Sequence, residues 1–225
     1  MIKLPTTMKR LLPIIAILLV ACNATQKSTD EILAEVWAKD QTIRQQMLEL
    51  TKAVTTEQRT DLIDSLITTN EALGRIDEEN MAVVDSILQQ GVPNNLSEES
   101  YKTIWIVIDH ASLEKQEQYL PLVEQMSLNG QVANDEYATL FDRVAMKRNR
   151  PQRYGSQAVQ FGSPDNMQLY IWPVENPAGL DSLRLSVGMT PLADYLKQLT
   201  ETTAIEAKYD PTLTIDQINT LQQGE

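Results

Sequence analysis

The chain has 225 residues, 19 Lys and Arg against 31 Asp and Glu, and a formal net charge of −12. This length allows one substantial hydrophobic core, and the negative charge disfavours nucleic acid as a partner because phosphate backbones would be repelled. A single cysteine, Cys22, excludes an intrachain disulfide, and together with a single histidine it leaves too few donors for a transition-metal site. We therefore predict no metal and no cofactor.

The beginning of the chain has the layout of a lipoprotein signal peptide. A basic start precedes an apolar stretch over residues 11–21, which is shorter than the roughly 20 residues that a membrane-spanning helix needs. The segment Leu19-Val20-Ala21-Cys22 resembles the lipobox of bacterial lipoproteins, in which the cysteine is acylated and becomes the first mature residue. Residues 1–21 are thus predicted to be a signal peptide, Cys22 the lipidation site, and residues 22–29 a lipidated tether.

The predicted processing also determines where the protein acts. Removing residues 1–21 removes three basic residues and no acidic ones, so the mature charge becomes −15. Acidic lipid headgroups would repel such a surface, so membrane contact should come from the lipid on Cys22. Asn23 is not the aspartate that retains many enterobacterial lipoproteins at the inner membrane. We expect an extracytoplasmic protein, at the periplasmic face of the outer membrane if the host is Gram-negative.

Helical periodicity dominates residues 30–225, which we expect to form one mostly helical domain. Ser28 and Glu31 make a capping box that begins the first helix. The apolar run Ile104–Ile108 could be a strand or a helix buried on every side, and its polar flanks favour a helix. Further helices are expected at about 57–73, 76–90, 113–128 and 134–148, the last capped by Asn134.

The pattern changes after Pro151. Residues 153–161 and 167–173 are rich in aromatic, glutamine and branched residues, and they flank the turn signal Gly162–Asn166. We predict a β-hairpin here, or two strands of a small sheet, followed by short helices near 180–187, 191–201 and after 214. The predicted fold class is mainly α with a small β-hairpin (α+β).

Several polar residues lie where the helical pattern calls for apolar ones. Asp40 lies on the apolar stripe of the first helix, and Arg44 follows one turn later, so the two can pair. Asn80 repeats this pattern in a later helix. His110 ends the apolar run, and any chemistry that needs an imidazole must use it. A purely structural role, such as a hydrogen bond between helices, stays open for each.

A second polar group follows in the chain. Asp142 and Arg143 lie near small residues that would let a ligand or another helix approach closely. Residues 152–157 are dense in hydrogen-bonding groups around Gly155, which could permit a bulge or a close backbone approach.

These segments resemble a bacterial family of unknown function that occurs in lipoproteins and in cytoplasmic proteins. The family motifs are Asp-Gln-x-x-Arg, Ile-Asp-x-x-Asn, Gln-His-Ala-Asp, Asp-Arg, Gln-x-Tyr-Gly-Thr-Gln, a Pro-(Ile/Val) pair and a later Arg. The matching segments are 40–44, 76–80, 109–112 (in part), 142–143, 152–157, 173–174 and Arg184. The similarity spans about residues 32–197. It implies that the polar residues belong to one constellation, and it implies no activity.

Three functions fit this constellation. The first is a polar cleft that binds a small polar ligand or peptide and is lined by Asp40, Arg44, Asn80, His110, Asp142, Arg143, Gln152, Tyr154 and Gln157. In this cleft Arg143 or Arg44 would pair with an anionic group. The second is a hydrolase-like enzyme with His110 as general acid or base, Asp142 as its orienting group and Ser156 as the candidate nucleophile. The third is a structural or assembly lipoprotein whose polar residues connect helices. The first two require His110, Asp142 and residues 152–157 to surround one opening.

Overall fold

The computed structural model describes residues 27–55, 57–89, 91–163 and 166–223. The predicted signal peptide, the lipidation site Cys22 and most of the tether lie outside these residues. Within the described ranges, none of the helices combines the length and the hydropathy needed to cross a bilayer.

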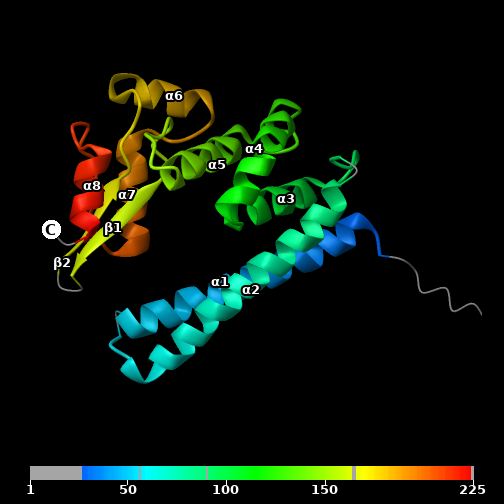
Figure 1. The fold of residues 1–225 in the computed structure, drawn as a ribbon, viewed down its shortest axis with the longest axis horizontal. Helices are drawn as coiled ribbons and strands as arrows, with labels where there is room; N and C mark the ends of the chain where they lie inside the picture. The colour runs from blue at the N-terminus through cyan, green and yellow to red at the C-terminus, as the bar shows by residue number, and fades with distance from the viewer. Residues whose placement is uncertain (1–26, 56, 90, 164–165, 224–225) are drawn as a thin grey trace, which may run out of the picture.

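Two long helices form an antiparallel hairpin along one side of the molecule (Figure 1). They are α1 (Thr29–Thr55) and α2 (Ile63–Leu88), joined by a short 3-10 turn, Thr60–Leu62. The predicted capping box is confirmed: the Ser28 N–H donates to the Glu31 carboxylate at 2.7 Å, and the Glu31 N–H donates to Ser28 Oγ at 3.2 Å.

The predicted break between two helices near residue 74 is wrong. Helix α2 runs unbroken through Gly74. A glycine inside a helix costs only about 1 kcal/mol relative to alanine, which the packing of α2 against α1 and α3 offsets.

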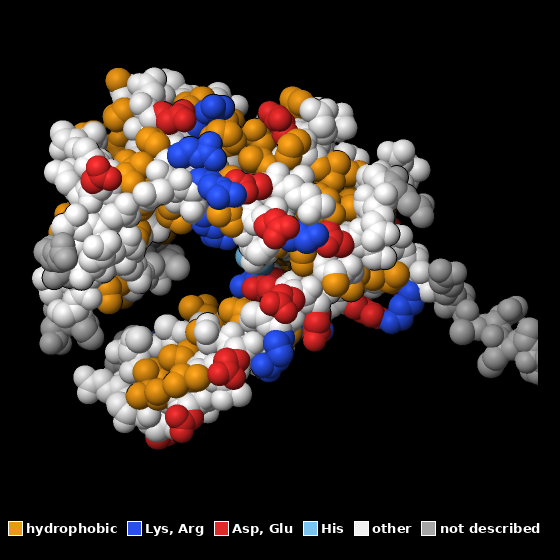
Figure 2. Space-filling view, viewed as in Figure 1, with side chains coloured by type: hydrophobic (Ala, Val, Ile, Leu, Met, Phe, Trp, Pro, Cys, Tyr) orange, Lys and Arg blue, Asp and Glu red, His pale blue; other side chains and the backbone are white. Residues whose placement is uncertain are grey.

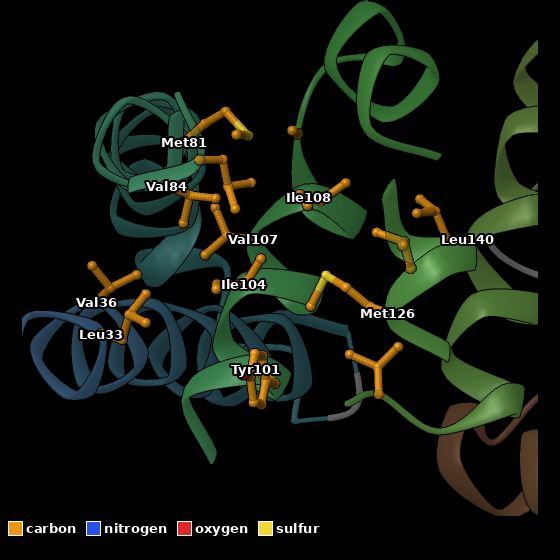
Figure 3. Packing of buried hydrophobic residues seen from close by; sticks show 14 of the residues in the cluster. Leu33, Val36, Met81, Val84, Tyr101, Ile104, Val107, Ile108, Met126 and Leu140 are labelled. Carbon is orange, nitrogen blue, oxygen red and sulfur yellow. The ribbon is translucent and has the colours of Figure 1, made fainter. Parts of the chain in front are cut away.

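Three further helices complete the larger hydrophobic core. They are α3 (Glu98–His110), α4 (Leu113–Leu128) and α5 (Asn134–Lys147). Helix α3 lies between the hairpin and the other two, so its buried side chains meet those of α1 and α2 on one side and those of α4 and α5 on the other (Figure 3). The buried side chains labelled there are Leu33, Val36, Met81, Val84, Tyr101, Ile104, Val107, Ile108, Met126 and Leu140.

The apolar run at residues 104–108 is helical, as expected, but it is not buried on every side. Ile104, Val107 and Ile108 are buried, whereas Trp105 and Ile106 are half-buried. Trp105 instead uses its ring N–H to donate to the Glu136 carbonyl at 2.8 Å, which connects α3 to α5.

The expected cap of α5 differs by one residue. Ala133 occupies the N-cap position, and its N–H donates to the Glu136 carboxylate at 2.9 Å. Asn134 is the first helical residue, and its Oδ1 accepts a hydrogen bond from Ser127 Oγ at 2.7 Å.

The C-terminal part of the chain contains the small sheet. The predicted hairpin is confirmed as β1 (Ala158–Ser163) paired with β2 (Asn166–Ile171), in antiparallel register. A third strand that the sequence did not reveal, β3 (Ala207–Lys208), runs parallel to β2. The neighbouring helices are α6 (Leu180–Ser186), α7 (Leu192–Thr203) and α8 (Ile215–Gln223), with a 3-10 turn at Pro177–Gly179. The fold is α+β and mainly helical.

A second, smaller apolar cluster holds this part together. Ile171, Leu180 and Leu192 are its buried members. The sheet and helices α6–α8 make no described contact with α1 or α2. Figure 2 shows the resulting hollow between the sheet end of the molecule and the free end of the hairpin.

Candidate functional site

The carboxylate of Asp142 is the anchor of the segment that precedes β1. Asp142 lies on α5 and is fully buried. It accepts hydrogen bonds from the backbone N–H groups of Arg153 (2.7 Å), Tyr154 (3.1 Å) and Ser156 (3.0 Å), and from Ser156 Oγ (2.9 Å). Burial raises the pKa of Asp142 above its ordinary value, although these hydrogen bonds oppose the shift. The strand begins later than predicted because residues 153–156 wrap around this carboxylate.

Arg184 holds the opposite side of the same loop. Its Nη1 donates to the carbonyls of Tyr154 (2.8 Å) and Gly155 (3.1 Å), and its Nε donates to the Thr190 carbonyl (2.7 Å). The guanidinium carbon lies 4.8 Å from the centre of the Tyr195 ring. Burial lowers the pKa of Arg184. In the part of the chain that the structure describes, no carboxylate forms an ion pair with this side chain.

Gln152 and Tyr154 support the loop from inside. Gln152 is fully buried, donates to the carbonyls of Gln157 (3.0 Å) and Trp172 (2.7 Å), and accepts from the Gln157 N–H (2.8 Å). The buried Tyr154 ring packs edge-on against Phe141. Both side chains therefore hold the loop in place, and neither is among the residues that line the pocket beside it.

A pocket of about 750 Å³ opens beside this loop, between α5, the sheet and α7; we call it the sheet pocket. Its lining includes Arg143, Ser156, Gln157, Arg184, Tyr195 and Gln198. Arg143 donates through Nε to Asp109 Oδ1 at 2.8 Å. Gln157 Nε2 donates to Ser156 Oγ at 3.1 Å and more weakly to the Thr139 carbonyl at 3.4 Å. Three residues predicted from the sequence, Arg143, Ser156 and Gln157, thus share one opening.

The remaining predicted residues form a separate group between α1, α2 and α3, the hairpin site. The buried carboxylate of Asp40 lies 3.1 Å from His110 Nδ1 and 3.2 Å from Arg44 Nε. Arg44 also donates from Nη2 to Asp77 at 2.5 Å. Burial would raise the pKa of Asp40, but the hydrogen bond and charge of His110 and the charge of Arg44 outweigh it, so this pKa is below its ordinary value. Burial raises the pKa of Asp77, and Arg44 offsets part of that shift.

The hairpin site also contains the donors of a conceivable metal site. Asp40, Asp77 and His110 each offer one ligand atom, and these atoms lie within 4.8 Å of one another. The guanidinium of Arg44, however, binds both carboxylates and already occupies the position of a cation between them. The arrangement fits a charge network better than a metal centre.

Asn80 lies on α2, one turn after Asp77. Its side chain is buried, and its Nδ2 has no hydrogen-bond partner among the described residues.

The predicted pairing of His110 with Asp142 is not formed. His110 bonds Asp40, and the oxygens of Asp142 are taken by residues 153–156, with Ser156 Oγ donating to them. The two side chains do not meet because His110, at the end of α3, lies against the hairpin, whereas Asp142 lies on the face of α5 that contacts the loop. His110 lines a different pocket, of about 480 Å³, on the hairpin.

The sequence did not single out three of the residues that organise these sites. Asp77 and Arg184 were both part of the motif resemblance, which is the signal that could have selected them. Tyr195 carried no such signal, because one tyrosine in a helix beside Leu196 is typical of a core contact.

We predict that Asp40→Asn weakens the fold at neutral pH but not in acid. Because the pKa of Asp40 is lowered by folding, its stabilisation is present above the ordinary value of 3.8 and is lost as the pH falls through the folded-state pKa. Urea unfolding at pH 7 should show a loss of about 2 kcal/mol, and the difference from wild type should shrink near pH 3. Glu71→Gln, which neutralises an exposed carboxylate on α2, should stay within about 0.5 kcal/mol of wild type. An undiminished difference at pH 3 would contradict this account.

Comparison with known proteins identifies a family but no activity. The model of a family described as "Family of unknown function (DUF6624)" matches residues 27–208. No curated protein and no solved structure shows significant similarity to the chain. The match covers both the hairpin site and the sheet pocket, and the chain therefore belongs to this family of unknown function.

Proposed function

We propose that this protein is a membrane-anchored, extracytoplasmic lipoprotein that binds a small polar ligand in the sheet pocket. The observation that carries the binding role is the construction of the pocket wall. Ser156 and Gln157 are held in place by the carboxylate of Asp142 and the amide of Gln152, so their positions are fixed before any ligand arrives. Such preorganisation lowers the entropic cost of binding.

The size and the chemistry of the sheet pocket also support this role. A volume of about 750 Å³ falls within the roughly 300–1,000 Å³ that is typical of small-molecule sites. Its lining is rich in donors and acceptors from Thr139, Gln157, Gln160 and Gln198. A polar ligand could exchange its hydration shell for these groups, which an apolar ligand could not use.

The anchoring part of the proposal is tested at Cys22. We expect the mature chain to begin at Cys22, to carry acyl chains there and to sediment with membranes, because lipoprotein processing attaches more than one chain. Cys22→Ala should abolish both the acylation and the membrane fraction. Mass spectrometry of the native product would contradict the proposal if it found Met1 in place and no fatty acid.

The binding part is tested by filling the pocket. Thr190 is exposed and lines the pocket, so Thr190→Trp should obstruct it, whereas Thr42→Trp places the same side chain on exposed α1. A panel of succinate, glycerol 3-phosphate, succinamide, glucose and 1,4-diaminobutane would be screened by saturation-transfer NMR and thermal shift. We expect at least one compound to bind wild type and Thr42→Trp and to bind Thr190→Trp at least about tenfold more weakly. Equal binding by all three proteins would place the ligand elsewhere, and binding by none would refute the role.

A second candidate function, acid–base catalysis, is supported by the hairpin site. With Nδ1 of His110 directed at the buried Asp40 carboxylate, Nε2 is the nitrogen left to accept a proton from water. His110 also lines a pocket, of about 480 Å³. This is the orientation that a general base needs, with Asp40 in the role that the sequence assigned to Asp142.

Hydrolysis of 4-nitrophenyl acetate tests this candidate. Water would attack the ester carbonyl, His110 would take the proton from water, and acetate and nitrophenol would leave. A general base typically contributes 10²–10⁴-fold, so His110→Gln should lower the enzymatic rate about 100-fold, and Ser156→Ala should leave it within about twofold. If His110→Gln keeps the wild-type rate, the hairpin site is not catalytic.

A further inference from the structure

We infer that the ligand of the sheet pocket is a small organic anion whose carboxylate or phosphate oxygens are bound by Arg184 and Arg143. This inference rests on the proposed binding function and adds the chemical class of the ligand. The binding hypothesis drawn from the sequence already offered Arg143 as a partner for an anionic group, and the structure adds Arg184 beside it.

The side chain of Arg184 is incompletely hydrogen-bonded by the described residues. The side chain is only 2% exposed, yet it lines the pocket. Its Nε and Nη1 are bound to three carbonyls, whereas Nη2 has no hydrogen-bond partner among the residues that the structure describes. Nη2 is not among the enclosed polar atoms that lack a partner, so it is reached from the pocket. An anionic oxygen in the pocket would supply the acceptor that Nη2 lacks, in a charge-assisted hydrogen bond.

Among the described residues, the lining also holds a second arginine with free donors. Arg143 contributes a second guanidinium, whose Nη1 and Nη2 have no hydrogen-bond partner within the described ranges. Asp135 is the single carboxylate in the lining, and its Oδ1 already accepts the Glu136 N–H at 3.0 Å. Asp109 lies outside the lining and balances part of the charge of Arg143 through Nε, but the Nη1 and Nη2 donors of Arg143 stay available to an anion in the pocket.

The volume of the sheet pocket indicates an organic ligand. The sheet pocket, at about 750 Å³, is much larger than an inorganic ion needs. Gln157 and Gln198 offer amide groups beside the two arginines, which suits an organic body with hydroxyl or amide substituents. The pocket therefore fits a small organic acid or phosphate ester better than free phosphate.

The experiment compares compounds of similar size and different charge. Succinate and glycerol 3-phosphate carry anionic groups, succinamide is the neutral analogue of succinate, and 1,4-diaminobutane is the cationic one. We expect the full chain to bind at least one of the anions, with an affinity that weakens as NaCl rises from 50 to 500 mM, and to bind succinamide and the diamine at least about tenfold more weakly. The two anions distinguish a carboxylate site from a phosphate site.

A charge variant then locates the site. Replacing Arg184 removes the hydrogen bonds that hold the loop and could unfold it, so the test uses Gln198→Glu, an isosteric change at an exposed lining residue. The added negative charge should weaken anion binding about fivefold. Gln46→Glu, an equally exposed change on α1, should leave the affinity unchanged.

The outcomes separate the inference from the function on which it rests. Tighter binding of succinamide or of the diamine, or equal affinity in Gln198→Glu, would overturn the anionic assignment while the binding function stands. Binding of no compound in the panel would overturn both.

Discussion

A single loop held between two opposite charges organises the C-terminal half of this protein. The backbone N–H groups of residues 153–156 point at the Asp142 carboxylate, and the carbonyls of residues 154 and 155 point at the Arg184 guanidinium. The peptide groups thus lie between the two ions and stabilise each of them, which offsets part of the desolvation cost of burying both. Gly155 permits this path: its φ is +66°, and a side chain there would also contact Leu180.

The two sites are distinct, but neighbouring residues of the sequence connect them. Asp109 and His110 are adjacent at the end of α3, as are Asp142 and Arg143 on α5. His110 faces the hairpin site, and Asp142 anchors the loop beside the sheet pocket. Arg143, which lines that pocket, forms the ion pair with Asp109 at 2.8 Å. The core of α3, α4 and α5 between the sites is tightly packed, with Ile104, Ile108 and Leu140 fully buried. The relative position of the two sites is therefore set by rigid helices and not by loops.

The sequence predicted where the helices and strands lie better than it predicted which of them pack against each other. The capping box at Ser28 located the start of the first helix correctly because a cap depends on residues only three apart. The helix break predicted near Gly74 is wrong because tertiary packing outweighs the weak helix propensity of one glycine. Strand β3 was missed because a two-residue strand depends on a partner that is distant in the sequence.

The polar residues were recognised as out of place, yet their grouping could not be read from the chain. Helical periodicity states which face a side chain lies on, but not which helix meets that face. Asp40 could be paired with Arg44 because both lie on one helix, whereas its bond to His110 joins residues 70 positions apart. The residues that the sequence assigned to one cleft therefore lie in two separate sites in the structure.

The long hairpin has a geometric consequence for the proposed lipid anchor. Helix α1 begins at one end of the molecule, and the sheet with α7 and α8 lies at the other (Figure 1). If the N-terminal segment is anchored as proposed, the opening beside the sheet lies at the end of the body opposite the start of α1. Molecules diffusing in the surrounding compartment would then reach that opening without first passing the anchored end.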